Sequence, residues 1–539
     1  MKKLMYVGFV CVLMVLVVGC GNTKKDSKEV TKERVESGSK LEENQETDKD
    51  NEETDQENDP SYYVEEGAQL SVFGYSGWNW GDTFNEEWAI VPVFKEKTNI
   101  DLKGFLSDTA TDGEQAYNLM LASGELADLI FNTRKNIMRD AQDGAFVELT
   151  DLIEEHGPNI KKFFEEKPLA YKRSLSPDGS IYMIPGQSGG TAATGFFIRQ
   201  DWLDNLGLEV PTTVDEFHDV LLAFKTEDAN GNGDPSDEIP FFARGDAVLQ
   251  DELTCMWGAR NGFYEKDGKI VYGAYQPEYL EAMTHLSIWY QEGIIDAEIF
   301  TRGSKSRDIL LGNNTGGSTV DWFGSTSSYN EKLKDDIPGF SFMPILPPAT
   351  KEGVVTANKK RGSGNSSGGA IGITTKDPVA AMKALDFLFS EEGRILANFG
   401  VEGEDYTMVD GKPMFTEETL SQDNVLSHLR KRGIQFGWSF HQDFEYEKQW
   451  VTEVAIEGMD MYINAGILAA EAPFIDLTTD EQARVNELLT PIQSYVDEQR
   501  QLWILGVKSI DDTKDDYIAK LKELGIEEVL DIQNTAYNR

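Results

Sequence analysis

Cysteine, histidine and positive charge are scarce in this sequence. Of its 539 residues three are Cys and five are His, and the 94 acidic residues outnumber the 50 basic ones. Three cysteines cannot form a disulfide framework. The histidines, at positions 156, 218, 285, 428 and 441, show no metal-site or catalytic spacing. A formal charge of −44 would repel a phosphate backbone, which argues against nucleic-acid binding.

Long apolar runs are also missing, because residues 4–18 form a run that is short for a membrane span. Two lysines precede this run and small residues follow it, which is the order found in a secretory signal. Its end, Leu16-Val-Val-Gly-Cys20, resembles a bacterial lipobox, in which the cysteine takes a diacylglycerol. An ordinary signal peptide with an incidental cysteine is the alternative. We expect a lipoprotein signal peptide over residues 1–19 and a lipid anchor on Cys20.

Apolar residues are almost absent from residues 21–60, which are rich in Glu, Asp, Lys, Asn, Thr and Ser. Such a segment cannot bury enough surface to offset its ordering entropy. We therefore predict that residues 20–65 hold the lipidated cysteine and a disordered acidic tether. Its flexible part would have a reach of roughly 35 Å.

Strand and helix patterns alternate beyond about residue 68, which favours parallel βαβ units. Residues 69–73, 100–105 and 128–131 are the first predicted strands. Thr213-Val-Asp-Glu216 is a capping box that predicts the start of a helix, and Asp377-Pro378 predicts another.

A polar run, Asp228-Ala-Asn-Gly-Asn-Gly-Asp-Pro-Ser-Asp-Glu238, contains the spacing of a cation loop. Its oxygen donors alternate as in the first half of an EF-hand, and Gly233 falls where the turn must be sharp. The twelfth position is Ile239 instead of Glu, so the full pattern fails, and a polar Asn-Gly turn is the alternative. The candidate metal ligands are the side chains of Asp228, Asn230, Asn232, Asp237 and Glu238 and the carbonyl of Asp234.

Signs of catalysis are weak. Gly364-Asn-Ser-Ser-Gly368 matches the G-x-S-x-G pattern, but a nucleophile elbow needs a strand before it and a helix after it. Here a loop precedes the pattern and a predicted strand follows. Carboxylates are numerous enough that some pair could reach glycosidase separation by chance. Nothing positive indicates an enzyme.

Several tryptophans lie near predicted loops or strand ends, namely Trp78, Trp80, Trp257, Trp322 and Trp438. Flat rings can stack on the apolar faces of sugars, and neighbouring polar groups can bind hydroxyls. Burial in a core is an equally good explanation of any one of them. If they gather at a cleft, they indicate a carbohydrate site.

Three stretches together suggest a family. Met120-Leu-Ala-Ser-Gly-Glu-Leu-Ala-Asp-Leu-Ile130 resembles the MLASGDLPD signature of extracellular solute-binding proteins of sugar ABC transporters. The segment from Arg199 to Thr213 resembles their RKDWLDKLGLKVPTT segment. The polar run with Glu238-Ile-Pro240 is similar to the cation loop of the LplA-like and alginate-oligosaccharide-binding branch of family 1.

The resemblance implies an α/β, two-lobed periplasmic-binding-protein type II fold with a hinge between the lobes. We expect the chain to cross the hinge near residues 186–194, 335–342 and 400–425. Lobe 1 would comprise residues 66–190 with 341–410, and lobe 2 residues 191–340 with 411–539. The polar run would hold a structural Ca²⁺, although it has one more residue before its acidic pair than the commonest form. Expected ligand contacts in the cleft are Trp78, Trp80, Asn132, Trp257, Trp322 and Trp438.

The expected function is that of a lipid-anchored, substrate-binding component of an ABC importer on the extracellular face of a Gram-positive membrane. It would act as a monomer, bind a sugar that is expected to be an oligosaccharide, and deliver it to the permease subunits. It would not be an enzyme and would not bind nucleic acid. The alternatives are a surface glycoside hydrolase and a sensory or adhesive carbohydrate-binding lipoprotein.

Overall fold

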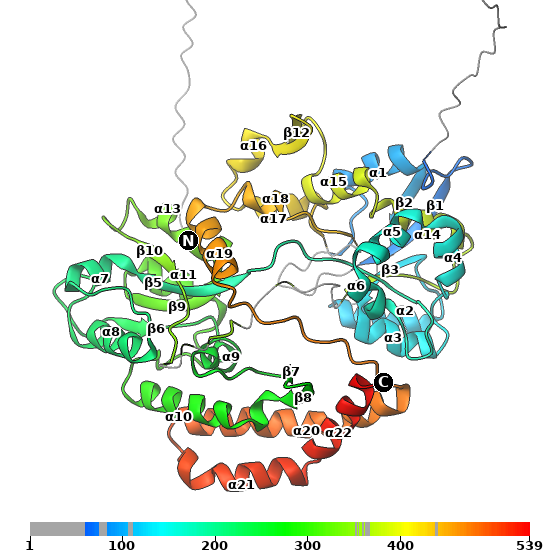
Figure 1. Cartoon of the computed structure of the whole chain (residues 1–539). Coiled ribbons are helices and arrows are strands. Elements are labelled where there is room, and N and C mark those ends of the chain that lie inside the picture. Colours follow the sequence, from blue (N-terminus) through cyan, green and yellow to red (C-terminus); the bar gives the residue numbers. More distant parts are fainter. Residues whose placement is uncertain are drawn as a thin grey trace, which may run out of the picture. The chain divides into compact units, whose positions relative to one another are not determined.

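The computed structural model describes residues 60–74, 83–105, 112–350, 353, 355–357, 361, 367–436 and 440–539 (Figure 1). The expected signal peptide, Cys20 and the tether up to residue 59 lie outside the described residues. So do Trp78, Trp80, Ser366 and Trp438. Within the described part of the chain, no helix has the length and apolar character needed to cross a membrane.

A five-stranded mixed sheet with the order β2-β1-β3-β11-β4 forms the centre of the first lobe. β1 runs parallel to β2 and to β3, whereas β11 is antiparallel to β3 and to β4. Its strands are β1 (Ala68–Gly74), β2 (Ile100–Gly104), β3 (Leu129–Thr133), β4 (Ile184–Pro185) and β11 (Ser367–Ile371). The first three strands coincide with the predicted ones within two residues.

Two buried apolar clusters pack against this sheet and bring helices from distant parts of the sequence together. The helices are α1 (Ile90–Thr98), α2 (Gly113–Ser123), α3 (Arg134–Gln142), α4 (Thr150–His156), α5 (Pro158–Glu166), α6 (Pro168–Ser174), α14 (Pro378–Phe387), α15 (Glu391–Phe399), α16 (Glu417–Leu420), α17 (Val425–Lys431) and α18 (Glu445–Lys448). A hairpin of β12 (Tyr406–Val409) and β13 (Lys412–Phe415) follows α15.

The second lobe is built on a four-stranded sheet with the order β10-β5-β9-β6. β9 runs antiparallel to β5 and parallel to β6, and β10 is antiparallel to β5. Its strands are β5 (Thr194–Arg199), β6 (Ile239–Phe241), β9 (Gly316–Trp322) and β10 (Phe342–Ile345). A separate hairpin consists of β7 (Phe263–Lys266) and β8 (Lys269–Tyr272).

The helices of the second lobe pack in two further apolar clusters. They are α7 (Gln200–Leu206), α8 (Val214–Thr226), α9 (Ala247–Asp251), α10 (Pro277–Gln291), α11 (Ser306–Gly312), α12 (Phe323–Ser327), α13 (Tyr329–Leu333), α19 (Glu453–Ala465), α20 (Thr479–Ile504), α21 (Ile510–Glu523) and α22 (Ile526–Tyr537), with the 3₁₀ turns η1 (Leu253–Trp257), η2 (Gly273–Tyr275) and η3 (Gly303–Lys305). The predicted capping box at Thr213 starts α8, and Asp377 caps α14 as expected.

The chain passes between the two lobes three times. It leaves the first sheet after β4, returns to it between Ile345 and Ser367, and leaves the first core again between Tyr446 and Val451. The last two passages lie further along the chain than the expected 335–342 and 400–425.

Long-range packing explains this difference. β10 pairs with β5 in the second sheet, so residues 342–345 do not belong to the first lobe. Phe415 and Leu429 are buried in the first core, so residues 411–446 do not belong to the second. The expected limits at residues 341 and 411 are corrected accordingly. The α/β architecture in two lobes is confirmed.

Candidate ligand-binding site

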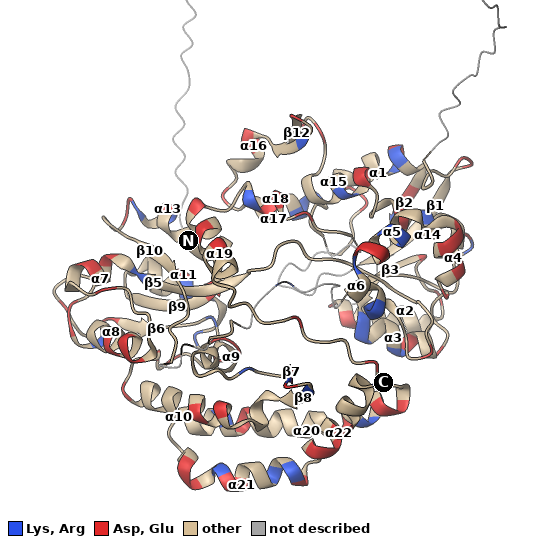
Figure 2. Ribbon diagram, in the orientation of Figure 1, with Lys and Arg blue, Asp and Glu red and all other residues tan. Residues whose placement is uncertain are grey.

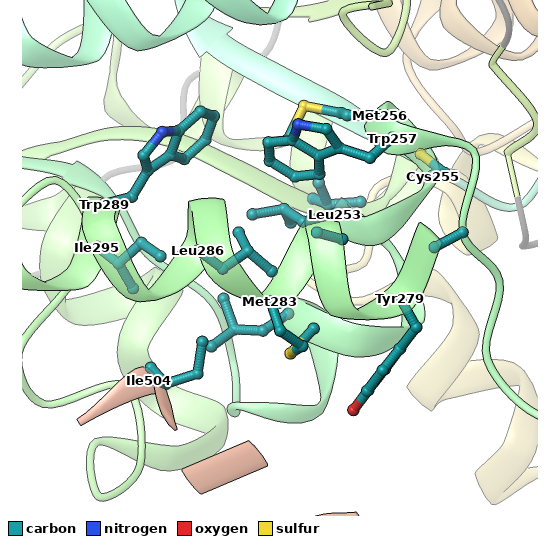
Figure 3. Close-up of a cluster of buried hydrophobic side chains, with 14 of the residues drawn as sticks. Leu253, Cys255, Met256, Trp257, Tyr279, Met283, Leu286, Trp289, Ile295 and Ile504 are labelled. Atoms are coloured by element: carbon teal, nitrogen blue, oxygen red, sulfur yellow. The ribbon is translucent and has the colours of Figure 1, made fainter. Parts of the chain in front are cut away.

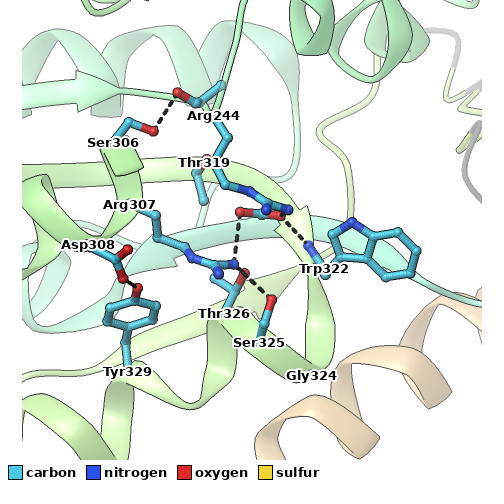
Figure 4. Close-up of polar contacts among 12 residues, drawn as sticks. Arg244, Ser306, Arg307, Asp308, Thr319, Trp322, Gly324, Ser325, Thr326 and Tyr329 are labelled. Atoms are coloured by element: carbon cyan, nitrogen blue, oxygen red, sulfur yellow. Dashed lines mark hydrogen bonds and ion pairs between the residues drawn. The ribbon is translucent and has the colours of Figure 1, made fainter. Parts of the chain in front are cut away.

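The end of β9 presents a tryptophan next to a buried carboxylate. β9 is buried along its length up to Asp321, and Trp322 is its first exposed residue. The side chain of Trp322 projects from the end of the strand (Figure 4) and is 42% exposed. A large aromatic ring with this exposure at a strand end can act as a stacking surface.

Two arginines donate to the Asp321 carboxylate. An Arg244 Nη2 lies 2.5 Å from Asp321 Oδ1, and Arg307 Nη1 lies 2.9 Å from Oδ2. Arg307 also donates to the hydroxyls of Ser325 and Thr326, at 2.9 and 2.7 Å. Two guanidinium groups on one carboxylate leave one positive charge beside Trp322, because only one of them is neutralised.

A third arginine joins this site to the segments that connect the lobes. The Arg361 guanidinium carbon lies 5.9 Å from the centre of the Trp322 ring and 5.1 Å from that of Phe444. Its Nη1 donates to the Gly189 carbonyl at 3.0 Å, and its Nη2 lies 2.7 Å from a Glu447 oxygen. A Cβ at Gly189 would lie 2.8 Å from the Phe444 nitrogen, so only glycine allows these segments to lie this close.

This arrangement suits a ligand with both apolar faces and polar edges. The Trp322 ring offers a flat apolar surface, and the fixed guanidinium forks of Arg244 and Arg361 can donate to oxygen acceptors. Burial and a hydrogen bond to Asp308 raise the pKa of Tyr329, the first residue of α13, to about 12. Of the residues in this site, the sequence predicted only Trp322.

Trp257 lies in the core of the second lobe and not on an accessible surface. It is 6% exposed, and its ring stacks on that of His285 with a centroid distance of 5.0 Å. It also packs against Trp289 with a centroid distance of 5.5 Å (Figure 3). Leu286 and Met256 belong to the same cluster. Its expected role as a ligand contact is therefore corrected: its position in η1 turns the ring toward α10.

Asn132 lies near the end of β3, opposite Gly368 of β11. It is half-buried, and its Oδ1 accepts hydrogen bonds from the Thr133 backbone at 2.7 Å and from the Asn136 side chain at 3.3 Å. Its side-chain oxygen is thus already used within the first lobe. Its role as a ligand contact stays a prediction.

The polar run between α8 and β6 gathers the expected oxygen donors. The Asn230 and Asn232 side-chain amides each donate to the Asp237 carboxylate at 2.8 Å. The Asp228 carboxylate accepts from the backbone of Asn232 and Gly233, at 3.0 and 2.9 Å. The loop therefore has its acidic and amide groups directed toward one another.

Glu238 supplies a test of whether this loop suits a cation. Its side chain is buried, its Oε2 has no hydrogen-bond partner in the described residues, and burial raises its pKa. The Asp234 side chain, by contrast, accepts from Ser236 and points to its own turn. Within the described residues no three His, Cys, Asp or Glu side chains are close enough to hold a metal alone. The Asn amide oxygens would have to complete the shell, as Ca²⁺ allows.

The family profile of the bacterial extracellular solute-binding proteins matches residues 77–395, which is more than half of the chain and covers strands of both lobes. The chain belongs to this family. The fructooligosaccharide ABC transporter substrate-binding protein FusA of Streptococcus pneumoniae is 26% identical over 84% of this chain and 87% of FusA. Lipoprotein LipO of Bacillus subtilis is 27% identical over 78% of this chain and 83% of LipO.

The fold of this chain is also similar to the solved structure of an alginate-binding relative. The alginate-binding protein AlgQ2, in a form without calcium ion, is 34% identical and superposes with a TM-score of 0.78. The match covers 89% of this chain and 100% of AlgQ2. The resemblance inferred from the sequence motifs is thus confirmed at the level of the family and the fold.

Proposed function

We propose that this solute-binding protein binds an oligosaccharide against Trp322 and delivers it to the permease of an ABC importer. The observation that supports this is the exposed Trp322 ring, held between the Arg244–Asp321–Arg307 network and Arg361. FusA and AlgQ2 are named for fructooligosaccharide and alginate, which supports a sugar oligomer as the ligand class.

No chemical step is required of such a protein. The ligand binds one arrangement of the two lobes more tightly than the other and so favours it. The permease would then recognise the protein in that arrangement. Because Trp322 ends a strand of the second lobe and Arg361 lies on an inter-lobe segment, a sugar at this site contacts groups that lobe closure would move together.

The polar run would hold a structural Ca²⁺ through Asp228, Asn230, Asn232, Asp237 and Glu238, with the Asp234 carbonyl as a further ligand. The unpaired Glu238 Oε2 supports this assignment. Such an ion supplies no chemistry. It would neutralise the carboxylates and fix the link between α8 and β6.

The binding proposal is tested by isothermal titration calorimetry against neutral and uronic-acid oligosaccharides. Trp322→Ala should weaken binding at least about tenfold, which corresponds to about 1.4 kcal/mol, while Trp322→Phe should retain most of the affinity. Ile288→Ala is the control. It removes an exposed apolar side chain elsewhere, on α10, and should bind the oligosaccharide as the wild type does. Equal affinities of Trp322→Ala and the wild type would show that the ligand does not bind against Trp322.

Two further measurements cover the rest of the proposal. Chromatography should recover the oligosaccharide intact, and release of shorter products would favour a glycoside hydrolase. In cells, Cys20→Ser should release the protein from the membrane, whereas Cys11→Ser should leave it attached.

A further inference from the structure

A pocket lies in the first lobe. Its volume is about 630 Å³, and it is lined by residues of α5 and α15, of the turn between β12 and β13, and of the segment 441–449. Neither Trp322 nor the three arginines beside it line this pocket. Phe163, Phe389 and Phe399 form apolar walls, so the pocket is large enough and partly apolar enough for a small organic molecule.

Arg394 of α15 lines this pocket. Its Nε is buried and makes no hydrogen bond in the part of the chain that is described. No ion pair of its guanidinium occurs among the described residues, although most other half-buried arginines here, such as Arg302 and Arg432, are paired with carboxylates. A buried guanidinium donor without an acceptor is costly unless a ligand or solvent supplies the acceptor.

His441 lines the pocket beside Arg394, in surroundings that disfavour its protonation. Burial and then the positive charges of Arg394 and Lys167 lower its pKa to about 4. Acidic residues are spread over the helices of both lobes (Figure 2), in keeping with the net charge of −44.

Carboxylates also line the pocket, but mostly at its rim. Glu166, Glu391 and Glu445 are exposed. Glu445 pairs with Lys448 at 2.7 Å, and Glu166 lies 4.0 Å from Lys162. Asp443 is half-buried, and its Oδ1 accepts from the Glu445 backbone at 2.9 Å. The inner donors therefore remain available to an external acceptor.

We propose that this pocket binds a small organic oxyanion, a carboxylate or a phosphate, with Arg394 as the charged donor and His441 and the phenylalanine rings as the surrounding walls. The site is independent of the oligosaccharide site. The oxyanion supplies an acceptor for the Arg394 Nε, and the rings cover its carbon skeleton.

The test is calorimetric titration of the purified protein with citrate, with inorganic phosphate and with neutral glycerol. We expect millimolar or tighter binding of at least one anion and none of glycerol. Binding of citrate alone identifies a carboxylate ligand, and binding of phosphate alone identifies a phosphate ligand. Absence of binding by both anions in the millimolar range overturns the proposal.

Variants give a second, independent result. Arg394→Gln should weaken anion binding about tenfold, since a hydrogen bond to a charged group contributes on this scale. Arg139→Gln, on α3 and outside the pocket, is the control and should bind normally. A bound anion should also raise the pKa of His441, because its negative charge favours the protonated ring. NMR of the ring measures this pKa with and without the anion. Unchanged affinity in Arg394→Gln, with the fold verified by circular dichroism, would refute the assignment.

Discussion

Asp321 is the residue that holds two guanidinium groups beside the exposed Trp322 ring. Asp321→Ala leaves Arg307, whose side chain is only 13% exposed, without its anionic partner. Removing one partner of a buried ion pair costs about 3–5 kcal/mol. We expect Asp321→Ala to lower the free energy of unfolding, measured with urea, by about 3 kcal/mol. This is the lower end of the range, because the second partner, Arg244, is more exposed and can be hydrated. Asp219→Ala, at a carboxylate that is 83% exposed, should change it by less than about 0.5 kcal/mol. Similar losses in the two variants would contradict this role of Asp321.

Trp257 and Trp322 show the limit of sequence reasoning at the scale of one residue. Both lie next to a turn or a strand end, and the local sequence does not separate them. Trp257 is buried because His285 and Trp289, on α10, cover its ring. Trp322, by contrast, is 42% exposed. Such contacts join residues far apart in the chain, so only the tertiary structure decides which tryptophan can meet a ligand.

At the scale of elements, the loop between α8 and β6 predicts a response to calcium. Because an ion bound only to the folded state raises the melting temperature, Ca²⁺ should raise it and a chelator should lower it. Asp228→Ala should abolish this response. Asp234→Ala should preserve it, because that side chain accepts from Ser236 and the expected metal ligand of Asp234 is its backbone carbonyl. Differential scanning calorimetry measures the melting temperature of the wild type with Ca²⁺ and with chelator, and that of each variant. An unchanged melting temperature of the wild type on chelation would contradict the proposed calcium site.

The contact between α14 and α5 predicts a pH dependence. Asp386 of α14 is buried and accepts from the backbone of Asn159 and Ile160 at 2.8 and 2.9 Å. Burial outweighs these hydrogen bonds and raises its pKa to about 6. The folded state therefore holds the proton more tightly than the unfolded chain, in which an Asp pKa is about 3.9. Its contribution to stability is complete below about pH 4 and is lost as the pH rises through about 6.

Comparison with Asp386→Asn isolates this contribution from those of the other acidic residues. The stability of the wild type relative to the variant should fall by up to about 3 kcal/mol between pH 4 and pH 7, at about 1.36 kcal/mol per pKa unit. Urea unfolding at each pH measures it. Asn159→Ala keeps the carboxyl group and should keep the pH dependence. A constant difference between wild type and Asp386→Asn would show that this carboxyl is ionised throughout.

Elements with local signals were predictable and long-range pairings were not. The capping box at Thr213 fixes the start of α8 through two hydrogen bonds within four residues, which the sequence displays directly. β10 was expected in the first lobe, yet it pairs with β5, more than a hundred residues earlier. A short apolar strand fits either sheet by its pattern alone. The lobe limits depend on such pairings, and they are the part of the fold that the sequence placed wrongly.

At the scale of the whole molecule, the two lobes also touch away from the segments that connect them. Arg173 of α6 pairs with Glu471 at 3.1 Å, and the Arg134 guanidinium lies 5.6 Å from the Phe474 ring centre. Arg134 is fixed by donating to the Arg173 and Leu175 carbonyls, both at 2.8 Å. The segment that supplies Glu471 and Phe474 leads into α20 of the second lobe. These contacts stabilise one arrangement of the lobes.

Glu471→Ala should therefore alter ligand binding without touching the Trp322 site. The Arg173–Glu471 pair is 22% exposed on each side, and pairs of this kind contribute up to about 1 kcal/mol. If the bound ligand and the Arg173–Glu471 pair favour the same arrangement of the lobes, the affinity of Glu471→Ala for the ligand should be about two- to fivefold lower than that of the wild type. Arg484→Ala, which breaks a pair with Glu528 inside the second lobe, is the matched control and should not change it. Calorimetry with the best oligosaccharide measures both variants. Unchanged affinity in Glu471→Ala would mean that the contact persists in every arrangement of the lobes, so that closure does not involve this edge.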